Sequence, residues 1–358
     1  MRIGFLCLCI CLSSWAFSQK NMWFGKPNTQ FGAYLETYYS FDFAMPQHAQ
    51  RQPYFFNFNR HNQVNLNLGL IRLDIDHSKY RGAFAFQAGT YVNDNYINEP
   101  SSLKNIHEAY IGIALDKKSK FWLDMGILPS YIGCESAIGL KNPTLTRSMV
   151  AENSPYFMAG AQASYKGDKW TAAFILNNGW QRITRVPGST APGLGFQIQY
   201  HPNNKWKINL SSFAGSDSPD SLHQNRYFQN LYFQGKAGKN GRLTIGADFG
   251  IQGTNETGKT NDWYGFLLIY RHQLKNNLNL AFRLEHFSDK KYVVVNQIVS
   301  NEFVVSGGSI NLDFSPLNNL MLRAEFRSLI GSGPIFRKKN GNSKTNNAFT
   351  FSLAFQLH

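Results

Sequence analysis

Alternation of apolar and polar side chains is the main pattern of this chain, and it is clearest around residues 121–165. The segments 121–128 (FWLDMGIL) and 156–165 (YFMAGAQASY) carry apolar or small side chains at every second position, which is the period of a β-strand. The intervening residues 129–155 are polar and interrupted by Gly and Pro, and they are longer than an ordinary connection. We therefore expect two strands joined by a long loop.

The same pattern recurs along the chain. Further alternating segments are found at residues 30–43, 63–76, 82–91, 103–115, 170–177, 193–200, 206–215, 226–236, 243–252, 263–274, 278–288, 303–314, 320–329 and 347–357. In segment 63–76 the phase changes, and we expect a β-bulge near residues 69–71. Together the segments predict about sixteen strands of roughly ten residues, a length suited to a tilted crossing of a bilayer.

Short and long connections alternate between these segments. Residues 77–81 and 116–120 are short turns, whereas residues 45–62 and 92–102 are long loops. In membrane β-barrels the short turns are periplasmic and the long loops extracellular. The prediction is an all-β fold, a transmembrane antiparallel β-barrel of about sixteen strands in the outer membrane, with both termini in the periplasm.

The N-terminus has the features of a secretory signal. Met1 and Arg2 precede an apolar stretch, and Ala16 and Ser18 place small residues before a cleavage site. We expect residues 1–18 to be a signal peptide, 19–28 a short periplasmic linker and 29–358 the barrel. Three of the four cysteines would leave with the signal, so Cys134 would remain alone and no internal disulfide could form.

Composition narrows the class of protein. The 358 residues are 15% aromatic, the mean hydropathy is −0.34, and the lack of a long apolar run after the N-terminus excludes a helical membrane protein. The net charge of +14 would become +13 after cleavage. Such a charge is compatible with nucleic acid, anionic lipid or an anionic solute as partner. Export of the chain argues against nucleic acid, which leaves lipopolysaccharide phosphates outside the barrel, or anions inside it.

The alternation also predicts which charged side chains face the lumen. Apolar positions must face lipid, so the charged residues of opposite phase should line the pore. These pore-lining candidates are Lys207, Asp248, Arg283, Glu285, Asp313, Arg323, Glu325 and Arg327. Two interpretations remain open: the charges pair to keep the lumen wet, or the excess of arginines gives a preference for anions.

The long loop 129–155 is the candidate for a constriction. Its charged candidates are Glu135, Lys141, Arg147 and Glu152. The loop could fold into the lumen and narrow it, or it could be an external flap. The sequence alone does not distinguish these arrangements.

No enzyme motif is found. The histidines are scattered without a G-x-S-x-G nucleophile motif, and H-E-x-x-H, C-x-x-C and acidic Ca²⁺ loops are missing from the sequence. We therefore expect no catalytic residue, metal or cofactor.

The segments LDMGILPSYIGCESA and NPTLTRSMVAENSPYFMAGAQASY, followed by NGW at 178–180, resemble the putative β-barrel porin-2 family, an OmpL-like group of the general porin superfamily. The matching positions are Gly126, Pro129, Gly133, Glu135, Arg147, Asn178, Gly179 and Trp180. The resemblance implies an outer-membrane barrel that passes small solutes, as a trimer with a pore narrowed by a loop.

The preferred hypothesis is therefore a porin for passive diffusion of small hydrophilic solutes, with a weak preference for anions. The alternative is a structural or adhesive barrel with a closed lumen, whose basic extracellular loops bind lipopolysaccharide or a partner. A transporter of hydrophobic solutes is less favoured, because no apolar hatch segment precedes the first strand.

Overall fold

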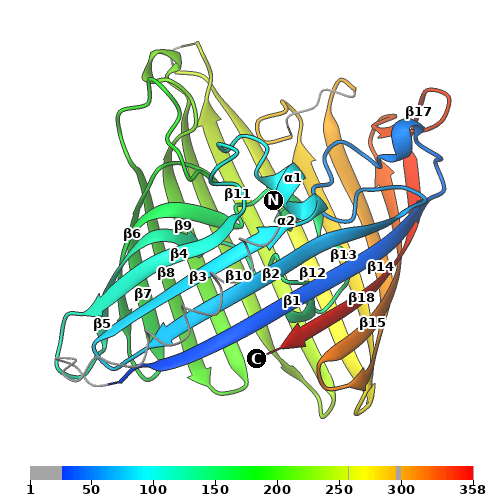
Figure 1. The fold of residues 1–358 in the computed structure, drawn as a ribbon. Helices are drawn as coiled ribbons and strands as arrows, with labels where there is room; N and C mark the ends of the chain where they lie inside the picture. The colour runs from blue at the N-terminus through cyan, green and yellow to red at the C-terminus, as the bar shows by residue number, and fades with distance from the viewer. Residues whose placement is uncertain (1–25, 257, 296–299, 358) are drawn as a thin grey trace, which may run out of the picture.

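The computed structural model describes residues 26–256, 258–295 and 300–357. The expected signal peptide and most of the expected linker lie outside these residues and stay predictions. The described chain forms a closed antiparallel barrel of sixteen strands, as the alternation predicted. Figure 1 shows the tilted strands surrounding a central space, with short turns at the lower end and longer loops at the upper end.

The barrel strands closely match the alternating segments of the sequence. They are β1 (Asn28–Asp42), β2 (Val64–Asp76), β3 (Tyr80–Ala88), β4 (Ile106–Ala114), β5 (Phe121–Pro129), β6 (Phe157–Lys166), β7 (Trp170–Asn177), β8 (Gly193–Asn203), β9 (Trp206–Ser216), β10 (Asn225–Ala237), β11 (Gly241–Gly253), β12 (Thr260–Lys275), β13 (Leu278–Asp289), β14 (Phe303–Leu317), β15 (Leu320–Gly331) and β18 (Thr345–Leu357). Each pairs with its neighbours in the chain, and β1 pairs with β18 to close the ring.

Short elements lie in the long loops. They are the hairpin of β16 (Phe336–Arg337) and β17 (Asn342–Ser343), the helices α1 (Thr90–Asn95) and α2 (Met149–Glu152), and the 3₁₀ turns η1 (Gln47–Ala49), η2 (Gly139–Lys141) and η3 (Asp220–Leu222). None of the helices in the described ranges has the length and apolar character that a membrane crossing requires.

The two faces of the barrel wall differ as the alternation requires. Apolar side chains such as Ile111, Leu284 and Phe31 project outward and are 65–76% exposed. Polar side chains of the opposite phase, such as Glu36 and Asn311, are fully buried inside. An exposed apolar band around a closed barrel is the surface that a bilayer covers.

The expected β-bulge is displaced from its expected position. The register of β1 against β2 shifts between Glu36 and Thr37, which leaves Asn67 unpaired, so the bulge precedes residues 69–71. As a result Leu68 and Leu70 are buried in the lumen, and they belong to the same buried cluster as Ile138 of the loop after β5. The prediction was wrong because it assumed that apolar strand residues face lipid, whereas these two pack against an inserted loop.

The third and fourth strands are shorter than expected. β3 ends at Ala88, and α1 follows instead of an extended segment to residue 91. Gly89 between them has φ of 132°, a backbone conformation that side chains other than glycine rarely adopt. This turn directs α1 inward, where Tyr91 is fully buried.

Candidate functional site: a loop anchored inside the barrel

Residues 130–156, between β5 and β6, fold into the lumen. Three of their groups bond to strands on different parts of the wall: the Tyr131 hydroxyl donates to the Ser212 carbonyl of β9 over 2.8 Å, the Gly139 amide donates to the Tyr34 hydroxyl of β1 over 3.0 Å, and the Met149 amide donates to Glu285 of β13 over 2.8 Å. The loop therefore lies across the lumen and not outside it.

Local sequence gives the loop its shape. Pro129 is the last residue of β5, and Gly133 adopts a positive φ of 85° that favours glycine. Ser148 caps α2, because its hydroxyl accepts a hydrogen bond from the Ala151 amide over 3.2 Å. These turns replace the extended backbone of the flanking strands.

Arg283 anchors the loop to β13 and β15. Its guanidinium donates to the Thr146 carbonyl over 2.6 Å and to Glu325 over 2.8 Å. Glu325 in turn accepts from the Thr146 hydroxyl over 2.9 Å. Burying an ion costs free energy unless it has an oppositely charged partner and its remaining donors form hydrogen bonds. Arg283 meets both conditions.

Two further arginines on β15 are also paired with carboxylates, and one of them bonds to the loop backbone. Arg323 pairs with Asp313 over 2.7 Å and donates to the loop carbonyls of Gly139 and Asn142 over 2.8 and 3.1 Å. Arg327 makes two hydrogen bonds to Glu285, of 2.9 and 2.7 Å.

The three arginines lie inside the barrel, where the alternation placed them, but the loop covers them. Their side chains are at most 4% exposed. Each is paired with a carboxylate, so they offer no free charge to a solute. The sequence could not reveal this, because the phase of a strand residue says nothing about which loop lies over it.

Two of the four charged loop candidates, Arg147 and Glu152, are also buried, and Glu135 is half-buried. Glu135 accepts from the Ser148 amide and hydroxyl, and burial raises the pKa of its carboxyl. Arg147 donates to the Leu145 and Ala137 carbonyls, both over 2.8 Å. These groups hold the loop together from within.

Glu152 connects α2 to the first long loop. Its carboxylate accepts from the Phe56 amide over 2.8 Å and from the Asn57 side chain over 3.2 Å. Burial is the main cause that raises its pKa to about 7. Among the four candidates only Lys141 is exposed.

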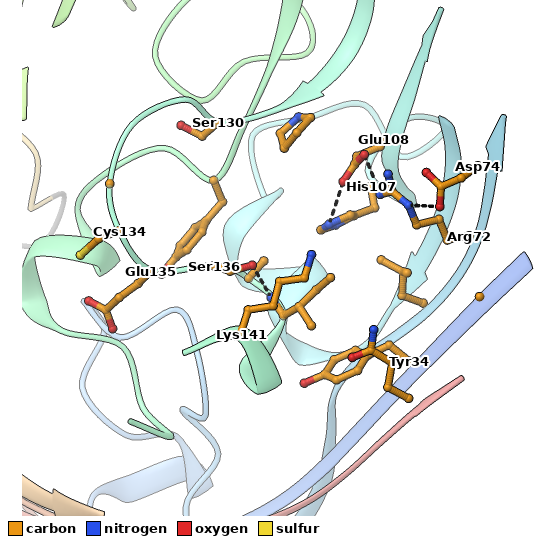
Figure 2. Close-up of a pocket in the computed structure, with 18 of the residues that line it drawn as sticks. Tyr34, Arg72, Asp74, His107, Glu108, Ser130, Cys134, Glu135, Ser136 and Lys141 are labelled. Atoms are coloured by element: carbon orange, nitrogen blue, oxygen red, sulfur yellow. Dashed lines mark hydrogen bonds and ion pairs between the residues drawn. The ribbon is translucent and has the colours of Figure 1, made fainter. Parts of the chain in front are cut away.

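Cavities lie on both sides of the inserted loop. A short-turn cavity of about 680 Å³ contains Arg72, Glu108 and Lys141 in its lining, and a long-loop cavity of about 300 Å³ contains Glu152 and Arg226. Figure 2 shows the short-turn cavity, where Arg72 bonds to Asp74 and Glu108 on one wall and Lys141 extends from the loop.

A narrow space, here called the neck, lies between the two cavities. It holds about 10 Å³, close to the room that one water molecule needs. Ile132, Val150 and Tyr156 are among its lining residues. Tyr156 also lines the short-turn cavity and Ser154 also lines the long-loop cavity. The neck is the smallest of these three spaces, and the sequence contains no signal for its apolar lining residues.

The remaining pore-lining candidates lie below the loop. The Lys207 ammonium is 4.9 Å from the centre of the Tyr232 ring and lines the short-turn cavity. Asp248 is buried and accepts from the Asn230 amide over 2.6 Å. Lys207 is therefore the one strand cation of the candidate set that reaches a cavity.

The residues of the NGW segment hold the loop after β7. The Gly179 amide donates to Asn177 over 3.0 Å, and the Asn178 side chain donates to the Ile183 carbonyl over 2.8 Å. The Trp180 amide donates to Asp217 over 2.6 Å, and its ring lies 5.1 Å from the Arg226 guanidinium. These contacts shape the mouth of the long-loop cavity, which Trp180 lines.

No cluster of three metal-ligating side chains is present in the described ranges. Cys134 is a free thiol, and burial raises its pKa, which disfavours the reactive thiolate.

A closed sixteen-strand barrel with an apolar outer band and a loop anchored across its lumen defines the class of porin-like outer-membrane barrels. A family model described as "Putative beta-barrel porin-2, OmpL-like" matches residues 28–357. The chain belongs to this family, and the resemblance seen in the sequence is confirmed. No curated protein matches the chain in sequence.

Solved structures share the fold. The anion-selective porin from Comamonas acidovorans has a TM-score of 0.62 at 8% identity, covering 93% of this chain and 100% of that one. The trimer form of OmpT from Vibrio cholerae has a TM-score of 0.61 at 8% identity, with the same coverage. The outer-membrane channel DcaP of Acinetobacter baumannii has a TM-score of 0.61 at 10% identity, covering 93% and 98%. At these identities the comparison defines the fold alone.

Proposed function

We propose that this barrel is a channel for passive diffusion of small hydrophilic solutes across the outer membrane. The observation that carries the proposal is the pair of polar cavities on opposite sides of the loop 130–156, which approach each other at the neck. Solutes would enter one cavity, pass Tyr156 and leave through the other. A porin fold with these cavities favours a channel over an enzyme.

We also propose a weak preference for anions. The support comes from exposed cations at the short-turn end, among them Lys141, Lys205 and Arg242, and not from the buried arginines of β13 and β15. A structural neighbour described as anion-selective is consistent with this preference. Charged rings at a pore mouth set ion selectivity without specific binding.

The orientation and assembly are further proposals. Short turns are periplasmic in barrels of this kind, so the short-turn end and both termini would face the periplasm. Assembly as a homotrimer would follow the trimer form of the OmpT neighbour.

An alternative function is binding of lipopolysaccharide by the long loops with a closed lumen. The observation that favours it is the group of exposed lysines Lys290, Lys291, Lys338 and Lys339 in those loops, combined with a neck of about 10 Å³. Phosphate groups of lipopolysaccharide are the anions such loops would meet.

Planar-bilayer conductance of the refolded barrel tests the proposal. We expect discrete current steps, a reversal potential that indicates anion preference across a salt gradient, and larger steps after Tyr156→Ala because the neck widens. Tyr227→Ala is the control, since Tyr227 is 55% exposed on the outer face and should leave the steps unchanged. Absence of steps from folded wild-type and Tyr156→Ala barrels would reject the channel and favour the alternative.

A further inference from the structure

A second cavity at the short-turn end has an unusual lining. It measures about 320 Å³ and lies between the loop and the wall formed by β8 to β12. Its charged and titratable lining residues are Lys141, His201, Lys205, Lys207, Arg242 and Arg271, and no Asp or Glu is among the residues that line it. We call this space the basic cavity. Lys141 and Lys207 also line the short-turn cavity, so the two spaces adjoin.

The strand register places like charges side by side in this wall. Lys236 of β10 is the direct partner of Arg242 of β11, and Arg242 is the direct partner of Arg271 of β12. On the other side, the Lys236 amide donates to the Lys205 carbonyl over 3.1 Å. Directly opposed like charges destabilise a sheet, so this row costs free energy unless an anion lies against it.

Among the residues that the structure describes, one carboxylate pairs with this row of cations. Arg271 donates to Asp313 over 3.0 Å, but Asp313 also holds Arg323 over 2.7 Å. The Nε atom of Arg271 is buried and has no hydrogen-bond partner within the described part of the chain. The row therefore keeps an excess of positive charge and unused donors.

The opposite wall at the same end is built differently. There Arg72 is matched by Asp74 and Glu108 over 2.6 and 2.7 Å, and Arg81 is matched by Asp124 over 2.7 Å. Cations on that wall are thus neutralised within the protein. The basic cavity differs from that wall, because Arg271 with Asp313 is the one ion pair that its lining residues make within the described ranges.

We propose that the basic cavity is a saturable binding site for a compact multivalent oxyanion, a phosphate group or a small phosphorylated solute. Guanidinium groups bind phosphate through paired hydrogen bonds, and lysines add compact positive charges. The volume of about 320 Å³ is within the range of small-molecule sites. The inference deepens the proposed diffusion function, because a solute held at one mouth would be concentrated before it passes the neck.

Titration calorimetry of the detergent-folded whole chain with inorganic phosphate at low salt tests the site. We expect saturable phosphate binding. Sulfate should compete with phosphate for the site, and chloride should not. The double variant Lys205→Gln/Arg242→Gln should weaken phosphate binding by about tenfold, since two charge-assisted contacts are lost. Both side chains are exposed, so the barrel should still fold.

A matched control removes the same charge from the same end. Lys169 and Lys239 are exposed in short turns and are not among the residues that line the basic cavity. Lys169→Gln/Lys239→Gln should leave the phosphate affinity within about twofold, because distant exposed charges are screened. Equal weakening by both double variants, or no saturable binding by wild type, would overturn the site.

Conductance in chloride separates this inference from the proposed function. Current steps without phosphate binding would reject the site and leave the channel intact. Phosphate binding by a folded barrel that shows no steps would reject the channel and support the site. Block of the steps by phosphate, relieved by Lys205→Gln/Arg242→Gln, would support both.

Discussion

Arg283 is fully buried between β13 and the inserted loop, and its guanidinium lies 3.2 Å from Glu285 and 2.8 Å from Glu325. Removing a charge from water costs several kcal/mol, which the pairing and hydrogen bonds offset only if both partners stay in place. The sequence predicted that this side chain points inward. It could not predict the burial, because the partner residues Thr144 and Thr146 lie in a loop that has no periodic pattern.

We expect Arg283→Gln to lower the free energy of unfolding by about 3–5 kcal/mol, because buried Glu325 loses its charged partner and Glu285 keeps only Arg327. A urea titration of the barrel in lipid vesicles, followed by tryptophan fluorescence, measures the change. Lys239→Gln removes an exposed cation from a short turn and should shift the midpoint little. Equal midpoints for the two variants would show that the network does not stabilise the barrel.

Glu152 should make stability depend on pH. Its pKa is raised from 4.5 to about 7 by burial, so folding favours the protonated carboxyl. Its contribution to stability is fully present below about pH 4.5 and is lost as the pH rises to about 7, a change of about 3 kcal/mol. Unfolding midpoints measured at several pH values should show this decrease in wild type relative to Glu152→Gln. Parallel pH profiles for the two proteins would contradict it.

At the scale of single elements, β5 shows what a sequence can and cannot predict. The alternation of residues 121–128 fixed its position, since outward side chains such as Met125, 60% exposed, must be apolar. The role of Gly126 was not predictable from that pattern. It has φ of 140°, and a Cβ there would lie 2.1 Å from the Ala109 carbonyl oxygen of β4. This glycine permits a close approach of two backbones.

A pair of glycine substitutions separates backbone strain from steric clash. Gly133 has φ of 85°, but no atom lies within 4 Å of a Cβ built on it, so Gly133→Ala should cost only about 1–2 kcal/mol. Gly126→Ala adds a clash with backbone and should cost more. Denaturant midpoints of the two variants measure the difference, and a milder effect for Gly126→Ala would be inconsistent with the geometry of β5.

At the scale of the whole molecule, the outer surface is what made the fold predictable. Lipid-facing strand positions must be apolar, so they constrain every second residue of each strand. For this reason the sixteen strands, and the face to which their side chains point, could be predicted for nearly the whole chain. The lumen has no such constraint. Its apolar residues, such as Leu68 and Ile132, belong to buried clusters like those of a soluble core. This is why the bulge in β2 was predicted at residues 69–71 and not at Asn67, and why the neck was not predicted.

A charged substitution on the lipid-facing apolar band should destabilise the barrel more, the deeper the residue lies in the bilayer. Leu284 lies in the middle of β13 and is 65% exposed, whereas Leu317 ends β14 at the short-turn end and is 60% exposed. We expect Leu284→Arg to cost about 2–4 kcal/mol and Leu317→Arg at most about 1 kcal/mol. Equilibrium refolding into lipid vesicles measures both. Similar costs at the two sites would mean that the band is not centred on Leu284.

The pairing of β1 with β18 has a consequence for the order of synthesis and folding. Ala33 lies opposite Leu357, so the ring cannot close until almost the entire chain has been made. Until β18 has been made, β1 and β15 form the two open edges of the sheet, and their unpaired backbone groups are templates for association with other chains. A ribosome-released fragment lacking β18 would keep both edges open. We expect such a fragment to associate with its copies through these edges.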